Sequence, residues 1–317
     1  MLKDTDDLSW YARKAARALT PGEREPDLAL TGRVEALFGE LRAGGVKGDG
    51  SSMTLFTRGL PAGCRSCLKG RGTNLYVTGL CTRDCFFCFN HKPRKDELVV
   101  HGIPVKSAAE AAEVVERFQL HSVGISGGEP LLFPDRVVEL LRALRALGRP
   151  LRIELYTNGD RAVPALLRRL KGAGLDSLRI NMAARDYDLS PLRRALDIFS
   201  DLAVEIPAVP SQLARQKKLI LELEALGVPY LNLHELFVSP ENAARMTAEG
   251  YAAVDADHQH LIWKPVPESG EAALKLLLFA LRHTRRLSAY YCSCGTQETI
   301  SRRGLARRAS ATAAASA

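Results

Sequence analysis

The chain has 317 residues, of which 46% are hydrophobic, and its formal net charge is +8. It is long enough to bury one large core, or a core with a small appendage. No run reaches the roughly 18 uninterrupted apolar residues of a membrane span, and the first residues lack the apolar centre of a secretory signal. We therefore expect a cytoplasmic protein with no membrane span.

Residues 1–60 are expected to form an N-terminal helical extension. Apolar residues recur at helical spacing in two groups, namely Leu8, Tyr11, Ala15 and Leu19, and then Val34, Leu37 and Leu41. A stretch rich in Gly, Ser and Asp over 44–52 interrupts this pattern.

Strand-like and helix-like segments alternate from residue 74 onward. The predicted strands are 75–78, 122–126, 151–156, 177–181, 202–207 and 230–236, and the predicted helices between them are 107–120, 135–147, 163–171, 191–199 and 212–226. This alternation predicts an α/β fold with parallel strands. Six such units are too few for a closed eight-stranded barrel, so we expect a partial (β/α)6 TIM-like barrel within residues 61–295. Chemistry in such folds gathers at the carboxyl ends of the strands.

The pattern weakens after the sixth strand. An apolar helix is expected over 271–282, followed by a basic turn and by residues 289–292. Residues 296–317 are rich in Ala, Ser and Arg and are expected to form a disordered, basic C-terminal tail. That tail is either solvated or in contact with nucleic acid or a partner.

Seven cysteines fall into three tight groups, at positions 64 and 67, at 81, 85 and 88, and at 292 and 294. In a reducing compartment such groups indicate metal ligands more often than disulfides. Cys81, Cys85 and Cys88 follow the first predicted strand, and three thiolates on one loop suit a [4Fe–4S] cube. The alternatives are a zinc site, which usually takes four ligands, or cysteines that merely belong to the core.

The spacing Cys81-x3-Cys85-x2-Cys88, with Phe87 before the last cysteine, resembles that of the radical S-adenosylmethionine (SAM) superfamily. The run from Ser126 to Pro130 (SGGEP), after the second predicted strand, looks like the second motif of that superfamily. A narrower likeness, to proteins related to pyruvate formate-lyase activating enzyme, rests on the segments 75–81 (LYVTGLC), 154–159 (ELYTNG), 173–180 (AGLDSLRI), 205–210 (EIPAVP), 230–236 (YLNLHEL) and 290–293 (YYCS).

The resemblance implies a cluster with one iron left open for the amino and carboxylate groups of SAM. It also implies cofactor contacts at the SGGEP motif, formed by Gly127, Gly128 and Glu129. The glycines let the backbone approach a ligand, and their carbonyls are expected to be free to accept from an ammonium group. Phe87 is expected to lie against the adenine.

Further cofactor contacts are expected at the ends of later strands. The resemblance implies a ribose contact at Asn158, although Asn-Gly is also an ordinary turn signal. Arg179 and Asn181 alternate with apolar residues, so both point to one face, where they hold the SAM carboxylate or substrate, or else form a structural pair. Glu205 lies in an apolar strand and is either a SAM or substrate contact or part of a buried salt bridge.

Two further sets of residues are candidates for substrate and for a second metal. Asn232 and His234 share one face of the sixth strand and are expected to meet the substrate, while Glu235 lies on the other face. Four thiols, from Cys64, Cys67, Cys292 and Cys294, match a full auxiliary Fe–S cluster or a zinc site. The remaining alternative is partial ligation, with one cysteine donating hydrogen.

The resemblance implies reductive cleavage of SAM to a 5′-deoxyadenosyl radical that abstracts hydrogen from a substrate. The expected electron donor is a flavodoxin or ferredoxin, which cations near the loop can attract, namely Arg71, Arg83, Lys92 and Arg94. A peptide or protein is the first expectation for the substrate; RNA and a small metabolite are the alternatives. Two other classes are a metal-stapled basic nucleic-acid-binding module, for which no reader motif is visible, and a simple electron carrier.

Overall fold

The computed structural model describes residues 28–254 and 258–316, and the chain divides into two compact units. Unit 1 comprises Met1–Leu60, Cys85–Phe89 and Glu205–Glu298, and unit 2 comprises Pro61–Asp84, Asn90–Val204 and Thr299–Ala317. The cysteine loop therefore contributes Cys81 to unit 2 and both Cys85 and Cys88 to unit 1. The helical spacing predicted for residues 8–19 lies outside the described part of the chain.

Parallel strands form the centre of unit 2. In chain order they are β3 (Gly72–Thr78), β6 (Ser122–Gly127), β7 (Arg152–Thr157) and β8 (Ser177–Asn181), and each pairs in parallel with the next. A row of apolar side chains crosses these strands at matching register positions and is fully buried, formed by Leu75, Ile125, Leu155 and Leu178. A hairpin of β4 (Val99–Val100) and β5 (Ile103–Pro104) extends the sheet beyond β3. The carboxyl ends of the parallel strands thus lie at one edge.

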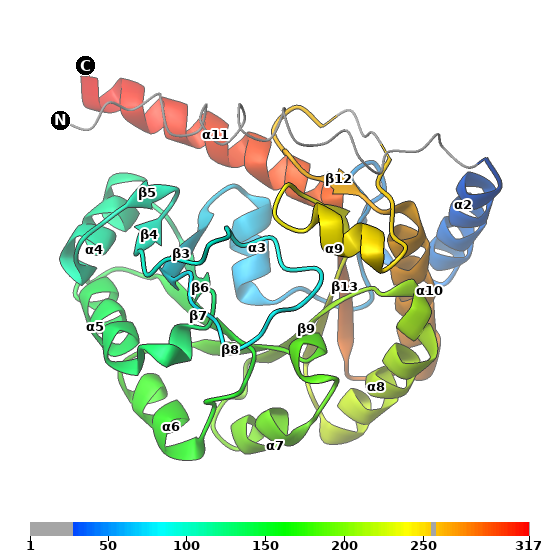
Figure 1. Ribbon diagram of the computed structural model, residues 1–317, viewed down its shortest axis with the longest axis horizontal. Helices are drawn as coiled ribbons and strands as arrows, with labels where there is room; N and C mark the ends of the chain where they lie inside the picture. Colours follow the sequence, from blue (N-terminus) through cyan, green and yellow to red (C-terminus); the bar gives the residue numbers. More distant parts are fainter. Residues whose placement is uncertain (1–27, 255–257, 317) are drawn as a thin grey trace. The chain divides into compact units, whose positions relative to one another are not determined.

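Helices pack on both faces of this sheet (Figure 1). The helices that follow the strands are α4 (Ala108–Arg117), α5 (Pro134–Arg145), α6 (Pro164–Gly172) and α7 (Ser190–Leu196), with short 3₁₀ turns η1 (Pro130–Leu132) and η2 (Ala183–Arg185). α4 begins at the predicted cap, because Ser107 Oγ accepts a bond from the Glu110 amide at 3.2 Å. On the opposite face, α3 (Ala62–Leu68) packs against β3, β6 and β7.

Unit 1 carries strands in the order β1, β2, β13, β10 and β9. These strands are β1 (Lys47–Asp49), β2 (Thr54–Phe56), β9 (Leu202–Pro207, within the unit from Glu205), β10 (Tyr230–His234) and β13 (Ser288–Cys292), beside a small hairpin of β11 (Phe237–Val238) and β12 (Lys264–Pro265). The helical elements are α2 (Leu28–Ala43), η3 (Pro210–Gln212), α8 (Leu213–Leu226), α9 (Ala243–Ala248) and α10 (Pro267–His283). β13 runs parallel to β10, whereas β2 runs antiparallel to β13. α10 packs against both α2 and α8, which buries Leu274, Leu276 and Leu277.

The predicted α/β class, with the parallel strands of a partial (β/α)6 barrel, is confirmed. The strands over 177–181 and 202–207 have the predicted bounds. Two features differ from the prediction. β13 continues the series beyond the six predicted strands, and residues 47–56 form β1 and β2 where the sequence predicts only a helical extension. These short strands depend on pairing with β13, a contact between distant segments that local sequence does not reveal.

The prediction of a disordered C-terminal tail is wrong for the residues that the structure describes. α11 (Cys294–Ser316) continues through this segment. Alanine and arginine are good helix formers, and Arg303 and Arg307 donate hydrogen bonds to the carbonyls of Leu68 and Lys69 at the end of α3. Neither α11 nor any other described helix has the length and apolarity needed to cross a membrane.

Candidate functional site

Three strand ends in unit 2 converge beside Cys81. Cys81 follows β3, and Asn158 follows β7. The Asn158 side-chain amide donates to Thr82 Oγ1 at 2.9 Å and lies 3.8 Å from Cys81 Sγ. The Asn158 side-chain oxygen accepts from the Asp160 amide at 2.9 Å, which fixes the orientation of the side chain. The predicted neighbours Cys81 and Asn158 are therefore brought together in this structure.

Glu129 links the end of β6 to the end of β7 and is fully buried. Its carboxylate accepts from the Asn158 backbone amide at 2.7 Å, from Thr157 Oγ1 at 2.7 Å and from the Leu131 amide at 3.0 Å. Burial raises the pKa of this carboxyl, an effect that these three donors oppose. Glu129 thus lies in the predicted site, but its oxygens are engaged by protein donors and hold Asn158 in place.

The two glycines of the SGGEP motif are required by chain packing. A Cβ at Gly127, where φ is +118°, would lie 2.4 Å from the Thr78 carbonyl oxygen. A Cβ at Gly128 would lie 2.0 Å from the Leu80 carbonyl oxygen. The expectation that both carbonyls are free is wrong for Gly127, because its oxygen accepts from the Asn90 side chain at 2.7 Å.

Asp160 connects several side chains next to Cys81 and Asn158, and the sequence did not indicate it as a site residue. Its carboxylate accepts from Thr82 Oγ1 at 2.6 Å, from Arg83 at 2.6 and 2.8 Å, and from Arg185. The hydrogen bond from Arg83 is the main cause that lowers the pKa of Asp160 to about 2. The only available signal was its position two residues after Asn158, at a strand end.

The cations expected to attract an acidic electron donor are largely paired with carboxylates. Arg83 pairs with Asp160, while Lys92 and Arg94 pair with Asp84 at 2.6 and 3.2 Å. The positive electrostatic potential of these cations is therefore weaker than their number in the sequence suggests.

The turn from Cys85 to Cys88 belongs to unit 1, where two side chains hold its backbone. The Cys88 amide donates to the Cys85 carbonyl at 3.1 Å. Arg245 donates to the carbonyls of Cys85 and Cys88 at 2.6 and 3.1 Å, and Asn242 donates to the Phe87 carbonyl at 3.2 Å. Sequence reasoning missed Arg245 and Asn242, because nothing local connects α9 with the cysteine loop.

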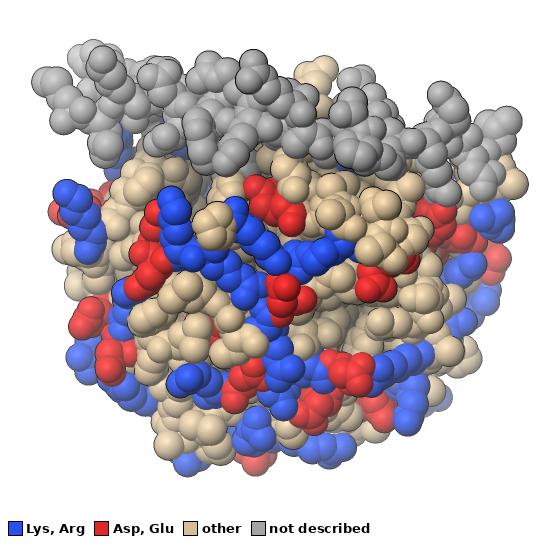
Figure 2. All heavy atoms as spheres, in the orientation of Figure 1, with Lys and Arg blue, Asp and Glu red and all other residues tan. Residues whose placement is uncertain are grey.

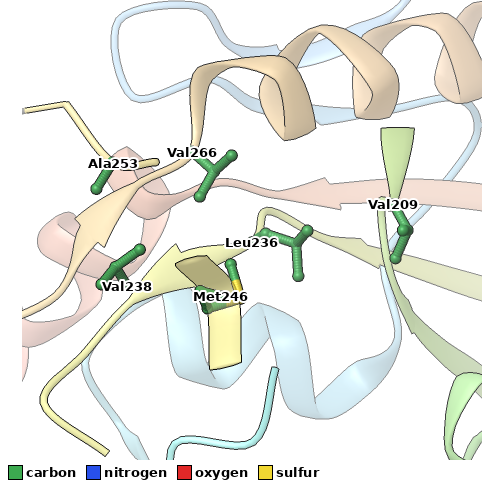
Figure 3. Packing of buried hydrophobic residues seen from close by; sticks show 6 residues of the cluster. All are labelled: Val209, Leu236, Val238, Met246, Ala253 and Val266. Atoms are coloured by element: carbon green, nitrogen blue, oxygen red, sulfur yellow. The ribbon is translucent and has the colours of Figure 1, made fainter. Parts of the chain in front are cut away.

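An apolar cluster supports the same turn. Phe86 and Phe87 pack against six buried residues of unit 1, which Figure 3 shows: Val209, Leu236, Val238, Met246, Ala253 and Val266. The two phenylalanine rings meet edge to face, with centroids 5.2 Å apart. Phe87 is half-buried, so an adenine contact at its remaining exposed surface stays a prediction.

Glu205, Asn232 and His234 meet within unit 1. Glu205 accepts from the Asn232 side-chain amide at 2.9 Å and lies 2.5 Å from His234 Nε2. The Glu205 side chain is 7% exposed, whereas the imidazole is 36% exposed. The carboxylate therefore orients a histidine whose ring reaches solvent. Cys292 is the register partner of His234 on the adjacent strand and shares its face.

Arg179 is not in the position predicted for a SAM carboxylate contact. It is fully buried and pairs with Glu154 through contacts of 2.8 and 2.9 Å. Glu154 also accepts from the Gly63 amide at 3.1 Å, which seats α3 on the sheet. Of the alternatives, the structural pair is therefore the one observed. Asn181 instead accepts from the Ala184 amide at 3.2 Å, in the turn that follows β8.

The thiols predicted for a second metal site have different surroundings. In unit 2, Cys64 Sγ lies 3.6 Å from Arg179 Nη1, and burial raises the pKa of Cys67 to about 12. In unit 1, Cys294 is buried beside Glu235, whose carboxylate accepts from the Cys294 amide at 2.7 Å. Burial raises the pKa of the Cys294 thiol well above its usual range. Glu235 directly follows β10, and Cys292 is among the groups that raise the pKa of the Cys294 thiol further.

Comparison with known proteins decides between the classes that the sequence left open. Residues 75–201, which run from within β3 to the residue before β9, match the Radical SAM superfamily. Residues 75–201 therefore form a radical SAM domain. The predicted likeness to that superfamily and the predicted enzyme class are thereby confirmed.

The relatives of this chain carry the names of different enzymes. A protein of Methanocaldococcus jannaschii named as a glycyl-radical enzyme activating enzyme is 29% identical over 230 residues, which are 69% of this chain and 60% of the relative. A protein of Saccharolobus solfataricus named as a GTP 3′,8-cyclase is 30% identical over 143 residues, which are 43% of this chain and 44% of the relative. The FeFe-hydrogenase maturase HydG from Carboxydothermus hydrogenoformans has a TM-score of 0.47 at 12% identity, covering 88% of this chain and 70% of HydG. The chain spans less than two thirds of the length of either curated relative.

The residues of this radical SAM protein fit the [4Fe–4S] cluster that the superfamily implies. Cys81, Cys85 and Cys88 are half-buried thiols on one short loop. The Asn158 amide near Cys81 Sγ is the kind of N–H···S contact that tunes a cluster-bound thiolate. Within residues 28–254 and 258–316, no three His, Cys, Asp or Glu side chains are already gathered as a metal site. The ligand assignment therefore rests on the sequence spacing and on the chemistry of the donors.

Proposed function

We propose that this protein holds a [4Fe–4S] cluster on Cys81, Cys85 and Cys88 and cleaves SAM reductively. When bound, such a cluster delivers one electron to the sulfonium of SAM, which releases methionine and a 5′-deoxyadenosyl radical. The observation that carries the proposal is the convergence of strand ends in unit 2, where the Asn158 amide lies 3.8 Å from Cys81 Sγ. Protein groups at such a site bind, orient and exclude water, while the cofactor supplies the reactivity.

Each residue of the site beside Cys81 is assigned a binding or positioning role. Asn158 is the proposed contact to the SAM ribose, and Glu129 positions it through its backbone amide. The SGGEP turn presents backbone at the place proposed for the SAM amino group, and the second carbonyl of that turn, from Gly128, is the better candidate, because the Gly127 carbonyl already accepts from Asn90. Phe87 is the proposed adenine contact.

We propose a peptide or protein as the substrate from which hydrogen is abstracted. The name of the Methanocaldococcus relative, an activating enzyme for a glycyl-radical enzyme, supports this substrate class. Asn232 and His234, with Glu205 as the orienting carboxylate, are the proposed substrate contacts. A reduced flavodoxin or ferredoxin is the proposed electron donor.

Production of 5′-deoxyadenosine tests the reaction. Anaerobically reconstituted protein is mixed with dithionite and SAM, and 5′-deoxyadenosine is measured by chromatography. We expect Cys81→Ala, Cys85→Ala and Cys88→Ala each to abolish the product together with the visible absorption of the cluster. Lys218→Ala, at an exposed site on α8, is the control and should match the wild type. Protein that holds only zinc, or full SAM cleavage by any of the three alanine variants, refutes the proposal.

A second experiment separates SAM cleavage from substrate attack. With a deuterated candidate peptide, deuterium should appear in 5′-deoxyadenosine. We expect Glu205→Gln and His234→Asn to reduce deuterium transfer while uncoupled SAM cleavage continues, because both residues are assigned to the substrate and neither to SAM. Equal loss of both signals would instead place Glu205 and His234 in the SAM site.

A further inference from the structure

A basic cavity in unit 2 is not used by the proposed reaction. Its volume is about 680 Å³, and it lies between α11 and the segments that precede β3 and β6. Among the residues that line it are Lys69, Arg71, His101, His121, Arg303 and Arg307. We call this space the basic cavity.

Charge of one sign dominates the basic cavity. Five of its residues are lysine or arginine and two are histidine, and none of the described residues that line it is Asp or Glu. The face shown in Figure 2 differs, because there lysine and arginine lie beside aspartate and glutamate. Like charges gathered without carboxylates repel one another, so a bound anion would relieve an unfavourable arrangement.

Burial, and after it neighbouring cations, lowers the pKa of both histidines of the basic cavity. Burial, and then the nearby Arg308, lower the pKa of His101 to about 4. Burial lowers the pKa of His121, and Arg71 is the first of several cations that lower it further. Both imidazoles are therefore neutral at pH 7, and the positive charge comes from lysine and arginine alone.

The arginines are held in place by the backbone of α3 and of the segment after it. Arg303 and Arg307 donate to the Leu68 and Lys69 carbonyls at 2.5 and 3.0 Å. Each guanidinium carries five N–H groups, so these single bonds leave donors for a ligand. Gly70, with φ at +64°, permits the approach, because a Cβ there would lie 2.6 Å from the Arg303 backbone carbon. Arg303 and Arg307 are exposed to solvent, and their bonds to these carbonyls fix α11 beside α3.

The basic cavity lies at the opposite edge of the sheet from Cys81. Arg71 and His121 immediately precede β3 and β6, whereas Cys81 and Gly127 are at the carboxyl ends of those strands. β3 has seven residues, which at about 3.3 Å each separate the two edges by about 23 Å. A ligand in the basic cavity is consequently too far away to be attacked at the proposed SAM site.

We propose that the basic cavity is a binding site for clustered phosphate groups, carried either by a free polyphosphate such as a nucleoside triphosphate or by the backbone of RNA. Arginine is suited to this ligand because its planar fork binds phosphate oxygens in pairs. The volume of about 680 Å³ lies within the range of small-ligand pockets. The site does not depend on the proposed SAM chemistry.

Calorimetric titration of the full chain, without SAM or reductant, tests the site. The probes are sodium tripolyphosphate, ATP and a single-stranded RNA of about 20 nucleotides, each titrated at two salt concentrations. We expect the Arg303→Ala/Arg307→Ala double variant to weaken binding at least tenfold, because it removes two charge-assisted donors to the phosphate oxygens. Arg302→Ala removes one positive charge from the same helix outside the basic cavity and should change affinity less than twofold. Arg71→Gln, which leaves the anchoring of α11 intact, should also weaken binding.

Several outcomes decide the matter. Stoichiometric binding of tripolyphosphate and ATP identifies a free polyphosphate as the ligand, and binding of RNA alone identifies a polynucleotide; either result supports the site. Absence of binding by all three probes overturns the proposal. It is also overturned if Arg302→Ala weakens binding as much as the double variant, or if Arg71→Gln and the double variant both bind as the wild type does.

Discussion

Replacing Glu129 with glutamine is the most direct test of how this protein positions Asn158. The wild-type carboxylate is fully buried and accepts three hydrogen bonds from Asn158, Thr157 and Leu131. The glutamine side chain has the same shape but offers one acceptor oxygen and one NH₂ donor. Because every partner is a donor, the NH₂ group must face an N–H or O–H in either orientation.

The magnitude follows from counting these bonds. The better orientation sacrifices only the bond to the Asn158 amide, since one Glu129 oxygen carries the other two. A bond to a charged group contributes about 1.5–3 kcal/mol, and a buried unsatisfied donor costs about 1–3 kcal/mol. Removing a buried charge offsets part of this loss, so we expect a net destabilisation of about 2 kcal/mol. For a domain of about 150–250 residues, that corresponds to a fall of about 4–8 °C in Tm.

Glu129→Gln should also weaken the binding of SAM. Once the Asn158 backbone is released, the side-chain contacts to Thr82 and Cys81 lose their fixed geometry. We expect the KM for SAM to rise about tenfold, which corresponds to about 1.4 kcal/mol of lost binding. Thermal unfolding monitored by circular dichroism and a SAM titration of 5′-deoxyadenosine formation measure the two effects. Glu113→Gln, at an exposed position on α4, is the control. An unchanged Tm together with an unchanged KM would refute the positioning role of Glu129.

Three further predictions concern other parts of the molecule. Arg179→Met should destabilise unit 2 by about 3–5 kcal/mol, because it removes the buried cation that contacts both oxygens of the Glu154 carboxylate, and the double variant with Glu154→Leu should recover most of the loss in a denaturant titration. Cys294→Ser should keep the iron content of the wild type in metal analysis, since burial keeps this thiol protonated; a fall in iron would show that Cys294 is a ligand. The pKa of Asp160 is about 2 in the folded protein against an ordinary value of 3.8, so its contribution to stability is complete above 3.8 and is lost as the pH falls towards 2. Asp160→Asn should therefore remove part of the acid dependence of unfolding below pH 4, and identical acid profiles would contradict this assignment.

The residues that approach the turn from Cys85 to Cys88 illustrate what sequence reasoning could not find. Arg245 and Asn242 lie about 155 positions further along the chain than the carbonyls they bind. The sequence around these two residues is a short polar segment without a distinguishing motif. Arg179 shows the converse case, since alternation along β8 correctly predicted its face but could not say whether Glu154 or a ligand would meet it there.

The sequence alone predicted most strands and helices between residues 75 and 236, the strand ends that carry the cysteines and the SGGEP motif, and the polar residues that share a face. Those properties follow from periodicity and spacing within a few residues, so they depend only on residues that are close together in the sequence. Tertiary structure decided which partner each polar group meets: Glu129 with Asn158, Arg179 with Glu154, Cys294 with Glu235, and α11 with the end of α3. These pairings join segments that only packing brings together. Once a carboxylate, thiol or guanidinium is buried, protein groups take the place of the surrounding water, and those groups determine what it does.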